Sequence, residues 1–306
     1  MRAPRARTAG LDAQALTIAY DGTDVVHDAD LALPRGQVTA LIGPNGSGKS
    51  TLLRAIARLH PARSGRVLVA GDGSDAGGGP AAEPGDAGDA PGPAGAIDAF
   101  ALSRSEFARR ITLLAQSRPT PAGLSVRDVV GFGRQPYRRR FRGTDPDGRR
   151  AIAHALTVTG VAEFADRGLE SLSGGQLQRV WMACCLAQDT DVLLLDEPTT
   201  YLDLRYQVEI LDLVRDLADT HGVTVGVVLH DLDQAAAVAD RVVLLSAGRV
   251  VAAGTPTQVY DAERLTETYG IRIEVDTSAG TPRTRAVGTH HLRTDQPQPE
   301  RTLHRS

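Results

Sequence analysis

The chain has 306 residues, 42% of them hydrophobic, which is enough apolar material for a packed core in one large domain or two small ones. The formal net charge of −3 gives no overall basic field of the kind that attracts nucleic acids. The two cysteines, Cys184 and Cys185, are adjacent, which suits a reducing compartment better than a secreted disulfide framework. No apolar stretch approaches the ~18 residues of a membrane span, and no signal-peptide core follows the basic N-terminus. A role at a membrane would therefore require another chain to cross the bilayer.

The N-terminal part of the chain predicts a β region that leads into a glycine-rich loop. We expect residues 1–13 to form a disordered tail. The segments Leu16–Tyr20 and Leu31–Pro34 are typical of short antiparallel strands, and Gln37–Ile42 is typical of a buried strand. A helix is expected over Ser50–Leu59, because its apolar residues recur on one face.

Residues 71–96 differ sharply in composition from their surroundings. They consist mostly of Gly, Ala, Pro and Asp and contain almost no large apolar side chain. Such a stretch cannot offset its ordering entropy, so we expect a disordered, low-complexity insertion after a strand at Val67–Ala70. A flexible loop of this length costs little in closure entropy. Ordered structure should resume over Ile97–Ala115 with a helix and then a strand that ends near Gln116.

The second half of the chain predicts a helical part followed by buried strands. Residues 120–170 carry helical patterns with few strand signals, which indicates a separate helical subdomain. The continuous apolar runs Asp191–Leu195 and Val223–Leu229 are typical of parallel strands that are covered on both faces. Leu204–Thr220 has the periodicity of a helix between them.

The last strands and the C-terminus complete the outline of one α/β domain. Val242–Leu245 and Arg249–Ala252 flank an Ala-Gly pair like the strands of a hairpin. Residues 276–306 are polar and rich in Pro, Thr and Arg, so we expect a disordered C-terminal tail. The folded domain is therefore predicted to span residues 14–275.

The glycine-rich loop after the first buried strand fits the phosphate-binding P-loop pattern. Glycines allow backbone N–H groups to turn inward around phosphates, and the following helix adds the positive end of its dipole. Lys49 can reach the β- and γ-phosphates of ATP, and the Ser50 hydroxyl can ligate Mg²⁺. A chance glycine-rich turn is the alternative, which the strand–loop–helix context disfavours. The predicted ATP-binding residues here are Gly43, Pro44, Asn45, Gly46, Ser47, Gly48, Lys49, Ser50 and Thr51.

An acidic pair, Asp196-Glu197, closes the apolar run Val192–Leu195. A carboxylate at the mouth of a buried strand is placed to bind Mg²⁺ through water, so Asp196 is a predicted metal-site residue. Glu197 would point toward the γ-phosphate and act as the general base that polarises the attacking water. A solvent-facing acidic pair would look the same locally, but a P-loop upstream favours the catalytic interpretation.

A third motif, Leu172-Ser173-Gly174-Gly175-Gln176, precedes a helix. Ser173 can cap that helix, and the free N–H groups there form a site for an anion. With the P-loop upstream and Asp196-Glu197 downstream, this segment resembles the signature of the ATP-binding subunits of ABC transporters. The resemblance implies an ABC-type P-loop NTPase fold, with a mixed sheet core, an antiparallel β subdomain and a helical subdomain. In that family the signature segment caps the γ-phosphate of ATP held by a partner subunit, so one copy of the motif set implies a homodimer.

The resemblance also assigns roles to four positions that are ambiguous by themselves. Tyr20 lies where an aromatic ring stacks on adenine, although it also reads as an ordinary strand residue. Gln116 matches the glutamine that meets Mg²⁺ and the attacking water, which makes it a catalytic and metal-site residue with Ser50 and Asp196. Asp203 matches the D-loop that crosses the dimer interface. His230 matches the switch histidine that contacts the γ-phosphate.

The local sequence within and around the motifs resembles that of one branch of the family. The segments around Gly123–Val130 and Ala187–Thr190, with Glu197–Asp203, are similar to importer ATPases for ferric siderophores, whose relatives serve haem and cobalamin. This likeness implies an ATP-hydrolysing subunit, with ATP and Mg²⁺ as cofactors, at the cytoplasmic face of the cell membrane. Its partners would be membrane permease subunits and, indirectly, a substrate-binding protein, with no nucleic acid.

Three other functions are compatible with parts of the pattern. A soluble ABC ATPase that acts on DNA or ribosomes would need a coiled-coil insertion or tandem cassettes, and the chain shows one cassette without heptads. A non-catalytic binding subunit is disfavoured because Lys49, Glu197 and His230 are all present. An exporter ATPase is a minor alternative.

Three further features invite hypotheses that the sequence leaves open. The run Arg134–Arg142 holds five arginines and could contact a permease or anionic lipids, or form a solvated charged face. Nucleic-acid contact is a third option, which the acidic net charge disfavours. Cys184 and Cys185 fit small core positions rather than a metal site, because no suitably spaced partner is present. His290 and His291 could bind a metal weakly, although histidines in a disordered tail are the simpler interpretation.

Overall fold

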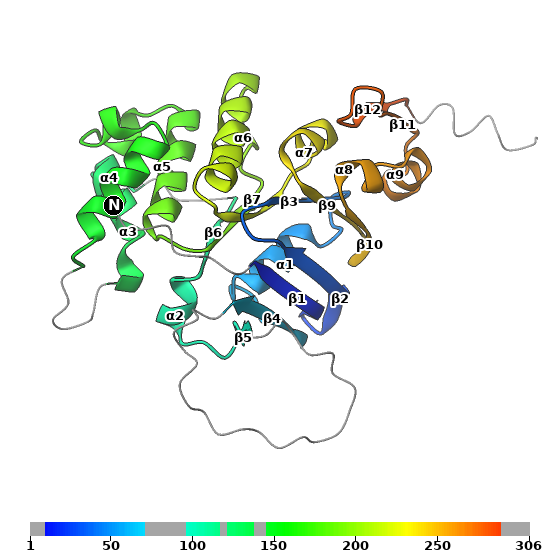
Figure 1. Ribbon diagram of the computed structural model, residues 1–306, viewed down its shortest axis with the longest axis horizontal. Coiled ribbons are helices and arrows are strands. Elements are labelled where there is room, and N and C mark those ends of the chain that lie inside the picture. The colour runs from blue at the N-terminus through cyan, green and yellow to red at the C-terminus, as the bar shows by residue number, and fades with distance from the viewer. Residues whose placement is uncertain (1–9, 71–95, 117–120, 138–144, 289–306) are drawn as a thin grey trace, which may run out of the picture.

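The computed structural model describes residues 10–70, 96–116, 121–137 and 145–288. Most of the expected insertion at 71–96 and most of both expected tails lie outside the described residues, as do His290 and His291. Figure 1 shows the elements in chain order, with the central sheet between the helices α6 and α7 on one side and α1 with the antiparallel strands on the other. No helix in the described ranges has the length and apolar character needed to cross a bilayer.

A six-stranded sheet forms the centre of the molecule, in the order β10-β9-β3-β8-β7-β6. Five neighbouring strands run parallel, and β10 pairs antiparallel with β9 as the predicted hairpin. Every residue of β3, β7 and β8 is buried, as the continuous apolar runs predicted. The bounds are β3 Val38–Ile42, β6 Ile111–Leu114, β7 Val192–Asp196, β8 Thr224–Val228, β9 Arg241–Ser246 and β10 Arg249–Gly254.

Two apolar clusters cover the two faces of this sheet. On one face, Val38, Ala40 and Ile42 of β3 pack with helices α6 (Leu204–Asp219) and α7 (Leu232–Val238). On the other face, Leu41 packs with helix α1 (Lys49–Ile56) and with the antiparallel sheet. The alternation along one strand therefore fixes α1, which follows the P-loop, on the face of the sheet opposite α6 and α7.

The antiparallel sheet has the order β2-β1-β4-β5, and its first strand corrects the expected N-terminal tail. Strand β1 begins at Leu11, so the expectation that residues 11–13 are disordered is wrong. Leu11 and Ala13 are buried because β1 pairs with β2 on one side and β4 on the other. This long-range pairing, rather than the short local pattern, orders the segment. The bounds are β1 Leu11–Tyr20, β2 Thr23–Leu33, β4 Ser64–Ala70 and β5 Ala96–Asp98.

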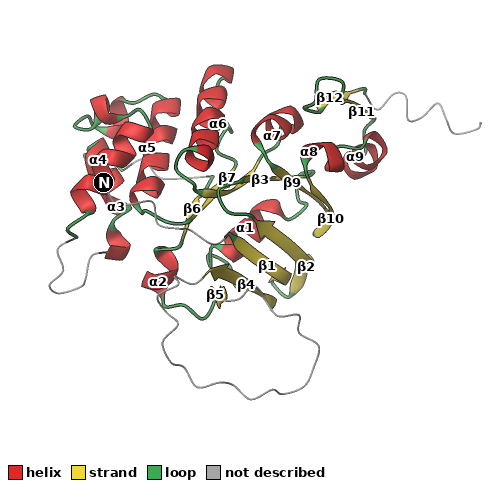
Figure 2. Ribbon diagram, viewed as in Figure 1, coloured by secondary structure: helices red, strands yellow, loops and turns green. Residues whose placement is uncertain are grey.

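Helices α3, α4 and α5 form a group with its own apolar core, at the left of Figure 2. Valines of α3, Leu156 of α4 and Val180 of α5 meet there and are almost completely buried. Short 3₁₀ turns at Gln135–Tyr137, Ala162–Phe164 and Leu169–Ser171 join these helices. The bounds are α3 Val126–Phe132, α4 Gly148–Val158 and α5 Gly174–Ala187.

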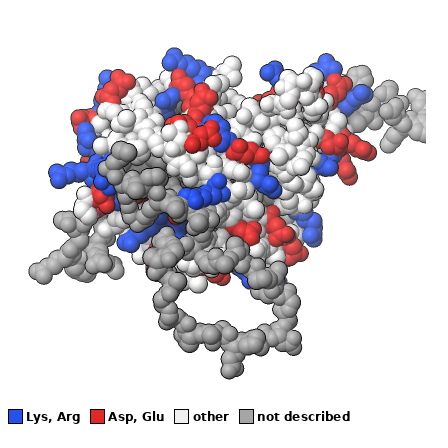
Figure 3. All heavy atoms as spheres, in the orientation of Figure 1, with Lys and Arg blue, Asp and Glu red and all other residues white. Residues whose placement is uncertain are grey.

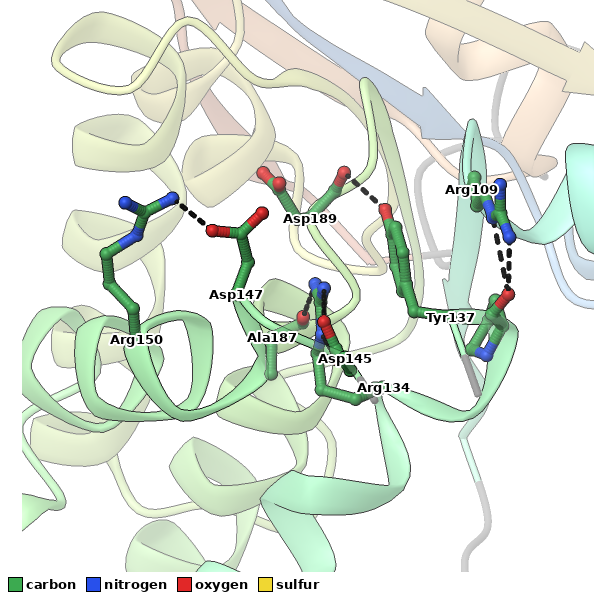
Figure 4. A network of polar contacts seen from close by, with 9 residues as sticks. Arg109, Arg134, Tyr137, Asp145, Asp147, Arg150, Ala187 and Asp189 are labelled. Atoms are coloured by element: carbon green, nitrogen blue, oxygen red, sulfur yellow. Dashed lines mark hydrogen bonds and ion pairs between the residues drawn. The ribbon is translucent and has the colours of Figure 1, made fainter. Parts of the chain in front are cut away.

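Arg134 joins the end of α3 to the end of α5, as Figure 4 shows. Its buried guanidinium forms a bidentate ion pair with Asp145 over 2.7 and 3.0 Å and donates to the carbonyl of Ala187. The ring of Tyr137 lies 3.7 Å from the guanidinium carbon. Arg134 is therefore a structural residue, and only the later arginines of the Arg134–Arg142 run, which lie outside the described residues, retain the hypothesis of a surface role.

The same junction ties α5 to the central sheet. Gln188 is the C-cap residue of α5. Its side chain donates to the carbonyl of Ala108 and accepts from the Thr112 hydroxyl at 3.0 Å. Ala108 ends helix α2 (Arg104–Ala108), and Thr112 lies in β6. Arg109, which follows α2, donates to the carbonyl of Pro136 (Figure 4). The C-terminal end of α5 is thus held by the core, whereas its N-terminal end carries the signature segment.

The C-terminal region contains structure where a disordered tail was expected. Strand β12 (Arg283–Ala286) pairs antiparallel with β11 (Ile273–Asp276), so the expectation for residues 276–288 is wrong. Thr284 donates to Asp233 of α7 through both its backbone N–H and its hydroxyl, at 2.7 and 2.8 Å. Ile273 and Val275 of β11 pack on the main core, whereas β12 has no apolar alternation and is joined to α7 by polar contacts. Helices α8 (Pro256–Val259) and α9 (Ala262–Tyr269) precede it.

Candidate functional site

The predicted P-loop lies between β3 and α1, at the carboxyl edge of the parallel strands. Gly43 adopts a φ of 144°, and a Cβ atom there would lie 2.1 Å from the backbone oxygen of Leu245. Only glycine fits a backbone that turns so close to β9. The loop then enters α1 at Gly48, with the N–H groups of the first helical turn available to an anion.

Lys49 lies within this loop rather than in solvent. Its side chain is buried, and Nζ donates to the carbonyls of Gly43 and Pro44 at 2.8 and 2.9 Å. Burial lowers the pKa of Lys49, and the nearby carboxylates of Glu197 and Asp196 oppose that shift. The ammonium group therefore supplies positive charge at the centre of the loop, next to two acidic residues.

Asp196 ends β7 with its side chain completely buried. Its Oδ2 accepts from Nη2 of Arg54 at 3.0 Å, across from the last turn of α1. Its Oδ1 has no hydrogen-bond partner among the described residues. Sequence reasoning missed Arg54, because nothing in the local pattern of α1 shows that its last turn faces the end of β7. The pairing leaves one carboxylate oxygen available in a buried position.

Glu197 brings together three of the predicted site residues. Its Oε1 lies 2.6 Å from Nε2 of His230, and its Oε2 accepts from the side chain of Gln116 and from the Thr200 hydroxyl. These residues follow the ends of β6, β7 and β8, and the carboxyl ends of neighbouring parallel strands meet at one edge. Glu197 has a φ of 54°, an uncommon conformation for a non-glycine residue and one that is often found at functional sites.

Tyr20 lies at the end of β1 with its side chain partly exposed. Its ring stacks on that of His60 with the centroids 4.0 Å apart and an interplanar angle of 24°. His60 is fixed by a contact of 2.9 Å between its Nε2 and the carbonyl of Ala19. One face of Tyr20 is therefore covered by the protein. His60 is a second residue that sequence reasoning missed, since its ring reaches Tyr20 only through the fold.

The signature segment begins α5 with a complete capping box. Ser173 Oγ accepts from the N–H of Gln176, and the Gln176 side chain accepts from the N–H of Ser173 at 2.9 Å. Leu172 precedes this cap and packs against the core of the helical group. Asp203 caps α6 through its side chain alone, which accepts from the N–H of Tyr206 at 3.0 Å. Both predicted partner-facing segments are thus helix starts.

Comparison with known proteins explains this combination of features. A family model described as ABC transporter matches residues 26–200, which is more than half of the chain. The chain belongs to the ABC transporter family.

Curated members of the ABC transporter family align with most of the chain. It is 38% identical over 276 residues to the ferric enterobactin transport ATP-binding protein FepC of Escherichia coli K12, covering 90% of this chain and 93% of that protein. It is also 38% identical over 274 residues to the iron(3+)-hydroxamate import ATP-binding protein FhuC of Bacillus subtilis, covering 90% of this chain and 91% of that protein. The cobalamin import ATP-binding protein BtuD of Halobacterium salinarum is 39% identical over 292 residues, covering 95% of this chain and 64% of that protein.

Solved structures of ABC proteins share the fold. An inward-facing metal-chelate type ABC transporter superposes with a TM-score of 0.72 at 24% identity, covering 93% of this chain and 98% of that chain. A dimeric ATP-binding cassette in a post-hydrolysis state, bound to ADP and Pi, gives a TM-score of 0.61 at 25% identity, covering 80% and 98%. The predicted ABC-type nucleotide-binding fold is therefore confirmed.

The donor set of this ABC transporter site fits a hydrated magnesium ion. Mg²⁺ keeps several waters and is held by one or two protein oxygens together with substrate phosphates. The buried Oδ1 of Asp196, which has no hydrogen-bond partner among the described residues, would supply one such ligand, directly or through water. No group of three or more His, Cys, Asp or Glu side chains suited to a metal occurs within the described ranges.

Proposed function

We propose that this chain is the ATP-hydrolysing subunit of an importer that carries an iron(III)–siderophore complex across the cytoplasmic membrane. The observation that carries the proposal is the meeting of Gln116, Glu197 and His230 at the strand edge that also holds the P-loop. The cargo class comes from the relatives, since FepC and FhuC are named as ATP-binding proteins of ferric enterobactin transport and iron(3+)-hydroxamate import.

The arrangement suggests how each side chain acts on ATP. The P-loop amides and Lys49 bind the phosphates, and Lys49 exchanges its contacts with Gly43 and Pro44 for phosphate oxygens. Glu197 accepts the proton of the attacking water as a general base, and Gln116 and His230 hold its two oxygens in place. His230 is nearly half exposed, so it can also turn toward the γ-phosphate.

Ser50, Gln116 and Asp196 are the residues that would hold Mg²⁺. When bound with ATP, this ion neutralises phosphate charge and so supplies electrostatic stabilisation of the transferred group. Arg54 occupies one oxygen of Asp196 and leaves the other without a partner in the described part of the chain, so that this second oxygen would be the one to contact the ion or its water.

The signature residues Ser173, Gly174 and Gly175 are proposed to act on the ATP of a second copy of the chain, and Asp203 to lie at the same interface. Support comes from the dimeric ATP-binding cassette that shares the fold. Dimer closure would move the helical groups, and membrane permease subunits bound to them would follow. The chain would then work at the cytoplasmic face of the membrane, coupled indirectly to a substrate-binding protein.

Cobalamin import is the second candidate, because the chain is 39% identical to the cobalamin import protein BtuD. Nucleic acid is not a proposed partner. On the face shown in Figure 3, Lys and Arg side chains alternate with Asp and Glu side chains, and no basic patch dominates that view.

An uptake assay tests the proposed function and its cargo. In cells that lack the native gene, the wild-type chain should restore import of iron-55 bound to a siderophore, and Lys49→Ala should reduce import at least tenfold, since the phosphate site loses its central charge. Labelled cobalamin serves as the second cargo. Restoration of cobalamin uptake alone would replace the iron proposal, and restoration of neither would remove the importer assignment.

The Tyr20–His60 stack makes a prediction about nucleotide binding. Tyr20→Ala should weaken binding of a fluorescent ATP analogue about fivefold, because an aromatic stack contributes about 1 kcal/mol beyond the area it buries. Tyr20→Phe is the matched control and should bind within about twofold of wild type, because it keeps the ring. Equal affinities for Tyr20→Ala and wild type would exclude Tyr20 from the adenine site.

A further inference from the structure

Tyr206, in the first turn of α6, lies directly against the signature segment. A Cβ atom built on Gly175 would be 2.2 Å from Cδ1 of the Tyr206 ring, so the ring touches the backbone at that position. A Cβ atom on the neighbouring Gly174 would meet nothing within 4 Å. The requirement for glycine at position 175 within this chain is therefore set by Tyr206, whereas no such contact restricts position 174.

Tyr206 also contacts two other residues of the predicted dimer interface. Ser173 Oγ donates to Tyr206 Oη over 3.4 Å. The backbone N–H of Tyr206 donates to Asp203 Oδ1 at 3.0 Å. Tyr206 thus links Ser173 and Gly175 of the signature segment to Asp203, the D-loop residue that caps α6.

The surroundings of Tyr206 indicate that this end of α6 faces another protein surface. Tyr201, Leu204 and Val208 expose 96%, 74% and 50% of their surface along the same helix start. Apolar side chains exposed together in this way are typical of interaction surfaces. A second copy of this chain is the partner that fits, because Ser173 and Asp203 border the same region.

We propose that Tyr206 is a positioning residue for the signature segment. Its ring holds Gly175 and its hydroxyl holds Ser173, so that the cap for the partner's triphosphate and the D-loop are presented as one fixed surface. Fixing both segments before association lowers the ordering cost of dimer closure. This inference rests on the proposed function, since it assumes that ATP drives dimerisation.

The test measures two binding steps in the Glu197→Gln background, in which ATP should persist. Binding of a fluorescent ATP analogue is measured at concentrations below dimerisation, and ATP-driven dimerisation is measured by analytical ultracentrifugation. Tyr206→Phe should weaken dimerisation about fivefold, as expected for one lost neutral hydrogen bond, and Tyr206→Ala at least tenfold. Analogue binding should stay within about twofold for both. Glu163→Gln, a change at an exposed residue of the helical group away from the start of α6, is the control and should dimerise like its parent.

A second measurement tests the ring contact without relying on dimerisation. Gly175→Ala should lower the melting temperature, because its Cβ atom overlaps the Tyr206 ring, and adding Tyr206→Ala should recover part of the loss. Gly174→Ala should not lower the melting temperature.

The outcomes separate this inference from the proposed function. Failure of the Glu197→Gln parent to dimerise with ATP would contradict the proposed function itself. A parent that dimerises, with Tyr206→Ala dimerising equally well, would overturn the positioning role alone. An equal loss of analogue binding and dimerisation in Tyr206→Ala would also overturn it, because that pattern indicates general damage to the fold.

Discussion

Replacing Glu197 by Gln is expected to reduce ATP hydrolysis at least hundredfold while ATP-dependent dimers accumulate. Gln has the same shape and can keep contacts with Gln116 and His230, but it cannot accept a proton from water. Loss of a general base typically costs 10²- to 10⁴-fold in rate. Phosphate release measures hydrolysis, and light scattering in ATP and Mg²⁺ measures dimers.

The matched control for this change is Glu163→Gln, which alters an exposed carboxylate in the helical group. It should leave both hydrolysis and dimerisation within about twofold of wild type, since exposed substitutions away from the site have small effects. Hydrolysis by Glu197→Gln at the wild-type rate would remove Glu197 from the mechanism. A loss of hydrolysis without dimer accumulation would instead indicate a defect in ATP binding.

Replacing Arg54 by Met is expected to lower the free energy of unfolding by about 2 kcal/mol. The change leaves the fully buried Asp196 carboxylate without its charged partner. Breaking a fully buried ion pair costs about 3–5 kcal/mol, and the value here is smaller because the Arg54 side chain is 41% exposed. The melting temperature should fall by roughly 5 °C, and ATP with Mg²⁺ should reduce the difference from wild type.

Two further variants show whether the uncompensated charge causes this loss. Adding Asp196→Asn to Arg54→Met should raise the melting temperature above that of Arg54→Met, because the buried group becomes neutral. Arg63→Met removes an arginine whose ion pair with Asp24 is exposed, and should cost less than about 1 kcal/mol. If the double variant melts no higher than Arg54→Met, the ion pair does not stabilise the fold as proposed.

Sequence patterns predicted the parts of the fold that depend on local chemistry. The continuous apolar runs gave β7 and β8 correctly, since strands buried on both faces need apolar residues at every position. The P-loop glycines and Asp196-Glu197 were predicted because phosphate and metal chemistry restrict both residue type and spacing. The order of the parallel strands brings Gln116, Glu197 and His230 together. The sequence implied this strand order only through the family resemblance.

The features that were missed depend on contacts between distant segments. Residues 11–13 are ordered by β2 and β4, and β12 is held by Asp233, so neither segment needed a strong local pattern. Three side chains that contact predicted site residues were also missed: Arg54 of α1 contacts Asp196, His60 after α1 contacts Tyr20, and Tyr206 of α6 contacts Gly175. No periodicity in the sequence shows where such side chains point. Long-range polar contacts of this kind leave little trace in a single sequence.

Helix α5 is joined to the central sheet at its C-terminal end and to α6 at its N-terminal end. It has 14 residues, which at 1.5 Å per residue gives a length of about 20 Å between Gln188, tied to the central sheet, and Ser173, which contacts Tyr206 of α6. Tilting the helix by about 5° around its C-terminal end would displace the Ser173 hydroxyl by about 2 Å, enough to make or break a hydrogen bond. A small change in the angle of α5 at the Arg134–Gln188 junction would therefore produce a displacement at Ser173 large enough to change the hydrogen bonds of its hydroxyl.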